Sequence, residues 1–191
     1  MKFLGDVPVH DLTYNDVFMV PSMSEVGSRL DVDLTTPDRV GTTIPIAVAN
    51  MTAVAGRRMA ETVARRGGVA VMPQDIPLDV LALVTDFVKS RHSIFDTPIT
   101  LGPTSTVGEA LSLIHKRSHG AVIVVDKGAP VGIFTEHDAV GFDRFTQLSN
   151  VMSRDMVTLP AGDSIDLLFD KLTEHRLSFA PVIDEDGSLV G

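Results

Sequence analysis

The order of apolar and polar positions divides the chain into three segments, the first of which reaches to about residue 73. Within it, residues 44–51 and 69–72 form two short, continuous apolar runs. Residues 57–66 lie between them with apolar side chains at helical spacing, and two glycines end that stretch. Short continuous apolar runs are typical of parallel strands that are buried on both faces. The first segment therefore predicts a strand–helix–strand unit with a right-handed crossover.

A single helix is expected for most of the second segment, residues 74–98. Pro77 suits the first turn of this helix, because the backbone N–H groups there have no partner within the helix in any case. Apolar side chains over residues 80–88 recur on one side and form a broad stripe. Residues 96–98 then read as a connector.

An internal repeat runs through the third segment, from about residue 98 to residue 191. Thr100-Leu101 recurs as Thr158-Leu159, 58 residues later. The same offset pairs Val107 with Ile165, Val124-Val125 with Val182-Ile183 and, with one extra residue in the second turn, Val131-Gly132 with Val190-Gly191. Each unit reads as strand, helix, strand, tight turn and strand. One such unit cannot cover both faces of its sheet, so we expect two units to pack as a pseudo-symmetric pair.

Composition narrows the classes of function. The net charge of −9 over 191 residues argues against a nucleic-acid partner, because binding a phosphate backbone requires a basic surface. The chain has no cysteine, so it holds neither a disulfide nor a thiolate metal site, and its histidines lack the context of a metal site. No apolar run approaches the roughly 20 residues of a membrane span, and the printed start lacks the features of a secretory signal. We therefore expect a cytoplasmic protein with no membrane partner.

Residues 132–138 combine a glycine, a threonine and an aspartate near the end of the first unit. We expect Gly132 to end a strand, Thr135 to be the N-cap of a helix, and Asp138 to lie in its first turn. A carboxylate in this place can accept hydrogen bonds from both hydroxyls of a ribose, and free N–H groups at a helix start can reach a phosphate. The alternative is that Thr135 and Asp138 only cap a helix.

The repeat and this motif together resemble the cystathionine-β-synthase-type repeat, called the CBS repeat, over residues 98–191. The resemblance implies an α+β pair made of a first repeat, residues 98–152, and an incomplete second repeat, residues 153–191. It also implies that ATP or GTP binds the pair as a regulator. The residues that would hold this regulatory nucleotide are Thr100, Thr135, Asp138 and Thr158.

The first segment resembles a different family. Residues 12–21 read Leu-Thr-Tyr-Asn-Asp-Val-Phe-Met-Val-Pro, and residues 44–51 and 67–71 continue the pattern of the IMP dehydrogenase/GMP reductase family. The resemblance implies an α/β fold in which residues 1–97 are the amino-terminal arm and first βα units of a catalytic (β/α)8 TIM barrel. Many members carry an inserted CBS pair after the second strand and helix of the barrel, where this repeat begins.

This resemblance also implies a substrate-nucleotide site at Ala49, Asn50 and Met51. These residues end a predicted strand, and the active sites of such barrels lie at the carboxyl ends of the strands. The family places this methionine against the purine ring, a contact that suits a polarizable thioether. The alternative is that Met51 is only barrel packing. Asn50 is typical of GMP reductases, whereas Thr52 matches neither the GMP reductases nor the IMP dehydrogenases. After the next strand, Met72-Pro73-Gln74 stands where the family often has His-Lys.

The activity that the resemblance implies is that of a purine-nucleotide oxidoreductase. In the family a cysteine thiolate attacks C2 of the nucleotide, so we expect no catalytic residue within this cysteine-free chain and expect it to be part of a longer protein. The favoured activity is conversion of GMP to IMP with NADPH. The alternatives are oxidation of IMP to XMP with NAD and a non-catalytic nucleotide-sensing CBS module. The resemblance further implies a homo-oligomer, tetrameric or octameric, and a monovalent cation such as potassium as an additional cofactor.

Overall fold

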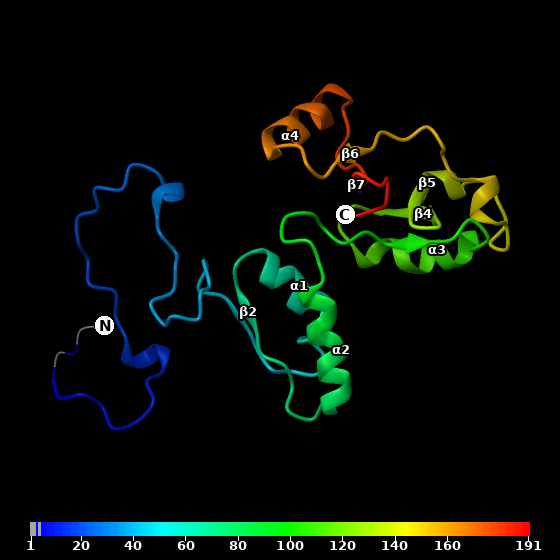
Figure 1. Ribbon diagram of the computed structural model, residues 1–191. Coiled ribbons are helices and arrows are strands. Elements are labelled where there is room, and N and C mark those ends of the chain that lie inside the picture. The colour runs from blue at the N-terminus through cyan, green and yellow to red at the C-terminus, as the bar shows by residue number, and fades with distance from the viewer. Residues whose placement is uncertain (1–2, 4) are drawn as a thin grey trace.

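The structure, a computed structural model, describes residue 3 and residues 5–191. Residues 5–46 form an extended arm, blue to cyan in Figure 1, at one side of the molecule. The arm contains two single-turn 3-10 helices, η1 (Tyr14–Asp16) and η2 (Arg29–Asp31). Within the described residues it contributes almost nothing to a core.

Local hydrogen bonds, rather than packing, hold the turns of the arm. The Asp16 carboxylate accepts hydrogen bonds from the N–H and the hydroxyl of Thr13, at 2.8 and 2.7 Å. The large apolar side chains of the arm lie in solvent, with Phe18 84% and Met19 96% exposed. An apolar stretch with this exposure gains little free energy from the hydrophobic effect in this arrangement.

A βαβ unit follows the arm, as predicted. Strand β1 (Ala47–Val48) pairs in parallel with β2 (Val69–Ala70), and helix α1 (Arg57–Arg65) connects them. Helix α2 (Leu78–Lys89) packs beside α1 (Figure 1). Pro77 is the N-cap of α2 rather than part of its first turn, and the helix is shorter than the predicted segment.

The expectation that both strands are buried on both faces is wrong. Ala47 and Val69 are exposed, and Val48 and Ala70 are only half-buried. Each strand has two residues, and α1 is the element that packs on both of them. One face of this two-stranded sheet therefore stays open, so β1 and β2 are less buried than the apolar runs predict.

The first repeat unit is a three-stranded sheet with one helix. Strand β3 (Thr100–Leu101) pairs in parallel with β4 (Ala121–Asp126), which pairs antiparallel with β5 (Ala129–Thr135). Helix α3 (Val107–Leu113) connects β3 to β4 and continues into a 3-10 turn, η3 (Ile114–Lys116).

The second unit has the same order of elements. Strand β6 (Leu159–Pro160) leads through α4 (Ile165–Glu174) to β7 (Val182–Ile183), which pairs with β6 in parallel. Ile183 then forms an antiparallel bridge with Leu189. The predicted order of strand, helix, strand and turn therefore occurs twice, and the last strand of the second unit is reduced to this bridge.

The 58-residue offset also holds for strand register. In each unit the parallel pair places equivalent residues opposite each other: Leu101 with Val124, and Leu159 with Val182. The antiparallel pairs agree once the extra residue of the second turn is counted: Val125 with Pro130, and Ile183 with Leu189. The 58-residue offset therefore relates the strand pairing of the two units, as well as their order of elements.

Both helices of the repeat begin behind an N-cap at equivalent positions. The Thr106 hydroxyl accepts a hydrogen bond from the N–H of Glu109 at 3.2 Å. The Ser164 hydroxyl accepts one from the N–H of Leu167 at 3.3 Å. Such caps satisfy an amide that has no partner within its helix, so the two units start their helices by the same local chemistry.

Each unit has its own small core. The first is formed by residues that α3, β4, β5 and the following 3-10 turn η5 (Leu148–Asn150) bring together: Val107, Ala110, Val122, Val124, Phe134, Leu148 and Met152. The second is smaller and consists of Leu159, Leu168 and Val182, with half-buried neighbours.

The prediction that Gly132 ends a strand is wrong, because β5 continues to Thr135. Gly132 lies in the middle of β5, where Ser153 of a crossing segment pairs with Ile133. A Cβ added at Gly132 would collide with the side chain of Met152. The glycine therefore allows a close approach of two backbones, which is a common reason for glycine within a strand.

None of the helices in the described part of the chain has both the length and the apolar character that crossing a bilayer requires.

Candidate functional site

The predicted substrate residues follow the carboxyl end of β1. Ala49 comes directly after the strand, and its carbonyl accepts a hydrogen bond from the Met51 N–H at 2.8 Å. The Met51 carbonyl accepts one from the N–H of Ala55 at 2.8 Å, so the chain turns here toward α1. Asn50 is exposed and Met51 is 58% exposed. The three residues lie at the strand end as expected, and their contact with a purine nucleotide stays a prediction.

Thr135 and Asp138, the predicted regulatory residues, are joined by two hydrogen bonds. Asp138 Oδ2 accepts from the Thr135 N–H at 2.7 Å and from its hydroxyl at 2.8 Å. The expectation that Thr135 caps a helix is wrong: Thr135 ends β5, and Glu136 precedes a single 3-10 turn, η4 (His137–Ala139). Within the described residues Asp138 Oδ1 has no hydrogen-bond partner, so this half-buried carboxylate can still accept an external hydroxyl.

The two other predicted regulatory residues do not join this pair. Thr100 is the exposed first residue of β3, and Thr158 is half-buried directly before β6. No hydrogen bond of the described residues connects either hydroxyl with Asp138. Their part in a nucleotide site stays a prediction.

A cavity of about 350 Å³ lies between the two repeat units. Its walls are mainly apolar and include Ile123 of β4, Leu159 of β6 and Pro181 before β7. His119 also lines it, with its ring centroid 5.9 Å from that of Phe179. Burial lowers the pKa of His119, and its buried Nε2 has no hydrogen-bond partner within the described residues. His119 therefore lines the cavity as a neutral imidazole.

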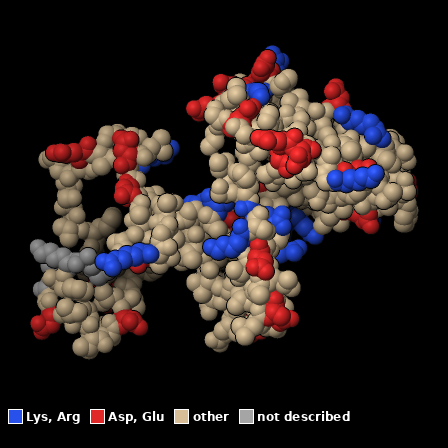
Figure 2. Space-filling model, in the orientation of Figure 1, with Lys and Arg blue, Asp and Glu red and all other residues tan. Residues whose placement is uncertain are grey.

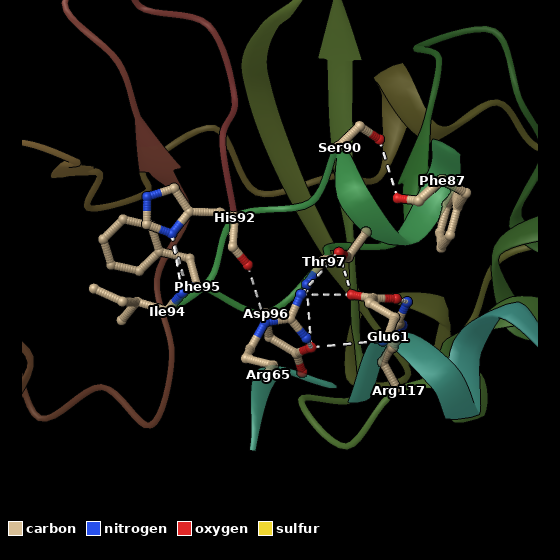
Figure 3. A network of polar contacts seen from close by, with 10 residues as sticks. All are labelled: Glu61, Arg65, Phe87, Ser90, His92, Ile94, Phe95, Asp96, Thr97 and Arg117. Carbon is tan, nitrogen blue, oxygen red and sulfur yellow. Dashed lines mark hydrogen bonds and ion pairs between the residues drawn. The ribbon is translucent and has the colours of Figure 1, made fainter. Parts of the chain in front are cut away.

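A buried carboxylate connects the βαβ unit with the first repeat (Figure 3). Glu61 of α1 is 2% exposed. Arg65 donates to its Oε1 and Arg117 to its Oε2, both at 2.6 Å, and the Thr97 hydroxyl donates to Oε1 as well. Asp96 completes the network, with ion pairs of 3.1 Å to Arg65 and 3.5 Å to Arg117.

The network fixes the protonation state of Glu61. Burial by itself would raise the pKa of this carboxyl group, but the hydrogen bonds from Arg117, Thr97 and Arg65 outweigh burial and lower the pKa to about 2. Glu61 is therefore a carboxylate at neutral pH. A buried charge with this many partners makes the junction between α1 and the first repeat specific in geometry.

Sequence reasoning did not identify this network. The only local signal is the spacing of Glu61 and Arg65, which places two opposite charges on one face of a helix. Thr97 and Arg117 lie 36 and 56 residues from Glu61, so their approach depends on the tertiary fold. Among the described residues no group of three or more His, Cys, Asp or Glu side chains could hold a metal ion.

Comparison with known proteins gives a consistent assignment. The family model for the IMP dehydrogenase / GMP reductase domain matches residues 11–175. The chain is 53% identical over 192 aligned residues to a GMP reductase of Mycobacterium tuberculosis. This alignment covers 100% of the chain and 40% of that protein. It is 31% identical over 184 residues to an inosine-5′-monophosphate dehydrogenase of Nitrosopumilus maritimus, covering 94% of the chain and 39% of that protein.

A solved structure agrees with these matches. The crystal structure of GMP reductase from Trypanosoma brucei in complex with guanosine 5′-triphosphate superposes with a TM-score of 0.60 and 27% sequence identity, covering 94% of this chain and 45% of that one. This likeness confirms the predicted α/β fold of the barrel region. The chain spans about 40% of the length of the curated relatives it matches. It belongs to the IMP dehydrogenase / GMP reductase domain family.

Proposed function

We propose that this chain is part of a GMP reductase, which converts GMP, NADPH and a proton to IMP, ammonia and NADP⁺. The observation that carries the proposal is the 53% identity to a GMP reductase over the whole chain, compared with 31% to an IMP dehydrogenase. Asn50 in the sequence Ala49-Asn50-Met51 agrees with it, since the resemblance associates this asparagine with the reductases. IMP dehydrogenation with NAD is the alternative that the experiments must exclude.

In the proposed reaction this chain positions the purine. Met51 lies at the carboxyl end of β1 with its side chain exposed, so its thioether can contact the flat face of a base. The Asn50 amide, exposed beside it, offers both a donor and an acceptor to the base or ribose. NADPH supplies the hydride that replaces the amino group at C2. The thiolate that activates C2 has to come from the rest of the protein, because the chain has no cysteine.

Replacement of Met51 tests this assignment in the full-length protein. We expect Met51→Ala to raise KM for GMP by about tenfold with a smaller change in kcat, because the lost contact is made by the bound substrate throughout the reaction. Met51→Leu keeps the volume of the side chain and should restore most of the affinity. Met23→Ala removes another exposed methionine, which lies in the arm, and serves as control. An unchanged KM in Met51→Ala would remove Met51 from the site.

We further infer that residues 98–152 and 153–191 are two CBS repeats, following the barrel portion 1–97, and that ATP or GTP binds them as a regulator. The shared register of the two units supports this inference. So does the Asp138 carboxylate near the end of β5, whose Oδ1 has no hydrogen-bond partner among the described residues. The GTP complex of the T. brucei enzyme makes GTP the first ligand to test. Thr100, Thr135 and Thr158 are the remaining candidates for contact with this nucleotide.

The variant Asp138→Asn tests the proposed regulatory site independently of the proposed substrate site. The change removes the charge that receives ribose hydroxyls, so we expect the Kd of GTP or ATP to rise by about tenfold or more, measured by calorimetry on the full-length protein. KM for GMP without effector should stay unchanged. Asp126→Asn, at the exposed end of β4, is the matched control. Unaltered nucleotide binding in Asp138→Asn would contradict the assignment.

The remaining parts of the proposal rest on the family resemblance. They are a monovalent cation such as potassium, assembly into a homo-oligomer of four or eight subunits, and a cytoplasmic location. Light scattering of the full-length protein with and without GTP measures the assembly directly.

A further inference from the structure

Basic side chains gather around a large cavity between α1 and the segment that follows α3. The cavity has a volume of about 1240 Å³, and Figure 2 shows the basic band in the middle of the molecule. Asp96 is the one acidic residue among the described residues that line it. Six of the chain's 16 lysines and arginines also line it: Arg57, Arg58, Arg65, Arg66, Lys116 and Arg117. This is a strongly positive site in a chain whose net charge is −9.

Most of this positive charge is not neutralised within the described residues. Glu61 and Asp96 pair with Arg65 and Arg117 only. The Arg58 guanidinium donates to the carbonyl of Lys116, which holds the two walls together without cancelling charge. The other three basic side chains, Arg57, Arg66 and Lys116, have no ion pair among the described residues.

The start of α1 adds backbone donors to the same wall. Gly56 is the N-cap and offers no side chain to the first amides of the helix. Gly56, Arg57 and Arg58 all line the cavity. Amides at a helix start and the positive end of the helix dipole favour a bound anion, and they add to the side-chain charges here.

We propose that this cavity binds a polyphosphate chain, as the free anion or as part of a nucleoside triphosphate. Arg57 and Arg58 lie in the first turn of α1, and Arg66 follows its last turn, about 13 Å away for a nine-residue helix. Basic groups that are spread along this length of helix and onto Lys116 suit several linked phosphates better than a single phosphate. Guanidinium groups match the oxygens of phosphate in two parallel hydrogen bonds.

The position of the cavity gives such binding a consequence. One wall contains Thr52 and Ala53, which directly follow Met51, and the opposite wall contains Lys116 and Ser118 of the first repeat unit. A bound polyphosphate therefore contacts both the segment after the proposed substrate residue and the repeat. The binding claim does not rest on the proposed activity, because it is measured without substrate.

Calorimetry with inorganic tripolyphosphate on the full-length protein tests the proposal. Arg66→Ala combined with Lys116→Ala removes two charges that form no ion pair among the described residues, and we expect Kd to rise by about tenfold or more. Lys89→Ala combined with Arg154→Ala removes the same charge outside the cavity and should leave Kd unchanged. GTP should displace tripolyphosphate from the wild type. Asp138→Asn should bind tripolyphosphate like the wild type, since this probe has no ribose.

Three results would overturn the proposal. Equal loss of affinity in the two double variants would show attraction to the overall charge only. Equal affinity for tripolyphosphate and for a glutamate oligomer would show that phosphate is not recognised. Loss of binding in Asp138→Asn, with normal binding in the Arg66 and Lys116 variant, would place the anion at the repeat motif instead.

Discussion

Glu61 shows how a single residue can depend on the whole fold. Its carboxylate is buried and receives hydrogen bonds from Arg65, Arg117 and Thr97. Only the contact with Arg65 follows from helical spacing, and the others become visible once the connector and the first repeat are placed beside α1. Residues that act locally, such as the Asp138 carboxylate near Thr135, could be located from sequence because their partner is three positions away.

The low pKa of Glu61 predicts a particular pH dependence of stability. Its folded pKa of about 2 lies below the ordinary value of 4.5, so the network stabilises the folded state above about pH 4.5 and this contribution is lost as the pH falls through about 2. We expect Glu61→Gln to lower the free energy of unfolding by about 3 kcal/mol at neutral pH. The difference from wild type should shrink as the pH approaches 2, as measured by denaturant unfolding at each pH.

Glu174→Gln, at the exposed end of α4, removes a carboxylate outside the network and is the control. A constant difference between wild type and Glu61→Gln from pH 7 to pH 2 would contradict the assigned pKa.

At the scale of elements, the sequence predicts order and register better than burial. The repeat offset correctly relates equivalent residues of the two units: Leu101 pairs with Val124, and their equivalents Leu159 and Val182 pair in the same way. It does not predict that β1 and β2 are short and open on one face, because burial of a strand depends on which other elements cover it. Gly132 was misplaced for a similar reason: the chain that crosses it at Ser153 is distant in sequence.

Gly132→Ala tests the close approach of that chain to β5. The added methyl group would collide with Met152, and we expect a loss of about 1–3 kcal/mol in the free energy of unfolding. Gly162→Ala is the matched control, because a Cβ there meets nothing within 4 Å. Equal stability of the two variants would show that β5 and residues 152–153 are farther apart than described.

In the whole molecule, the βαβ unit and the first repeat unit, which differ in architecture, meet at one junction. The βαβ unit contributes α1, the repeat contributes Arg117, and the buried network and the basic cavity both lie between them. The resemblance to the family could be recognised from the residues of each unit alone. The junction could not, because its side chains come from residues 57–66, 96–97 and 116–118. The sequence pattern also does not decide between reductase and dehydrogenase activity, because that choice depends on the chemistry at C2 of the nucleotide.

The most direct test is a spectrophotometric assay of the full-length protein with both pairs of substrates. We expect NADPH to be consumed only when GMP is present, and one IMP and one ammonia to form for each NADPH oxidised. Formation of NADH from IMP and NAD, without consumption of NADPH in the presence of GMP, would contradict the proposed activity.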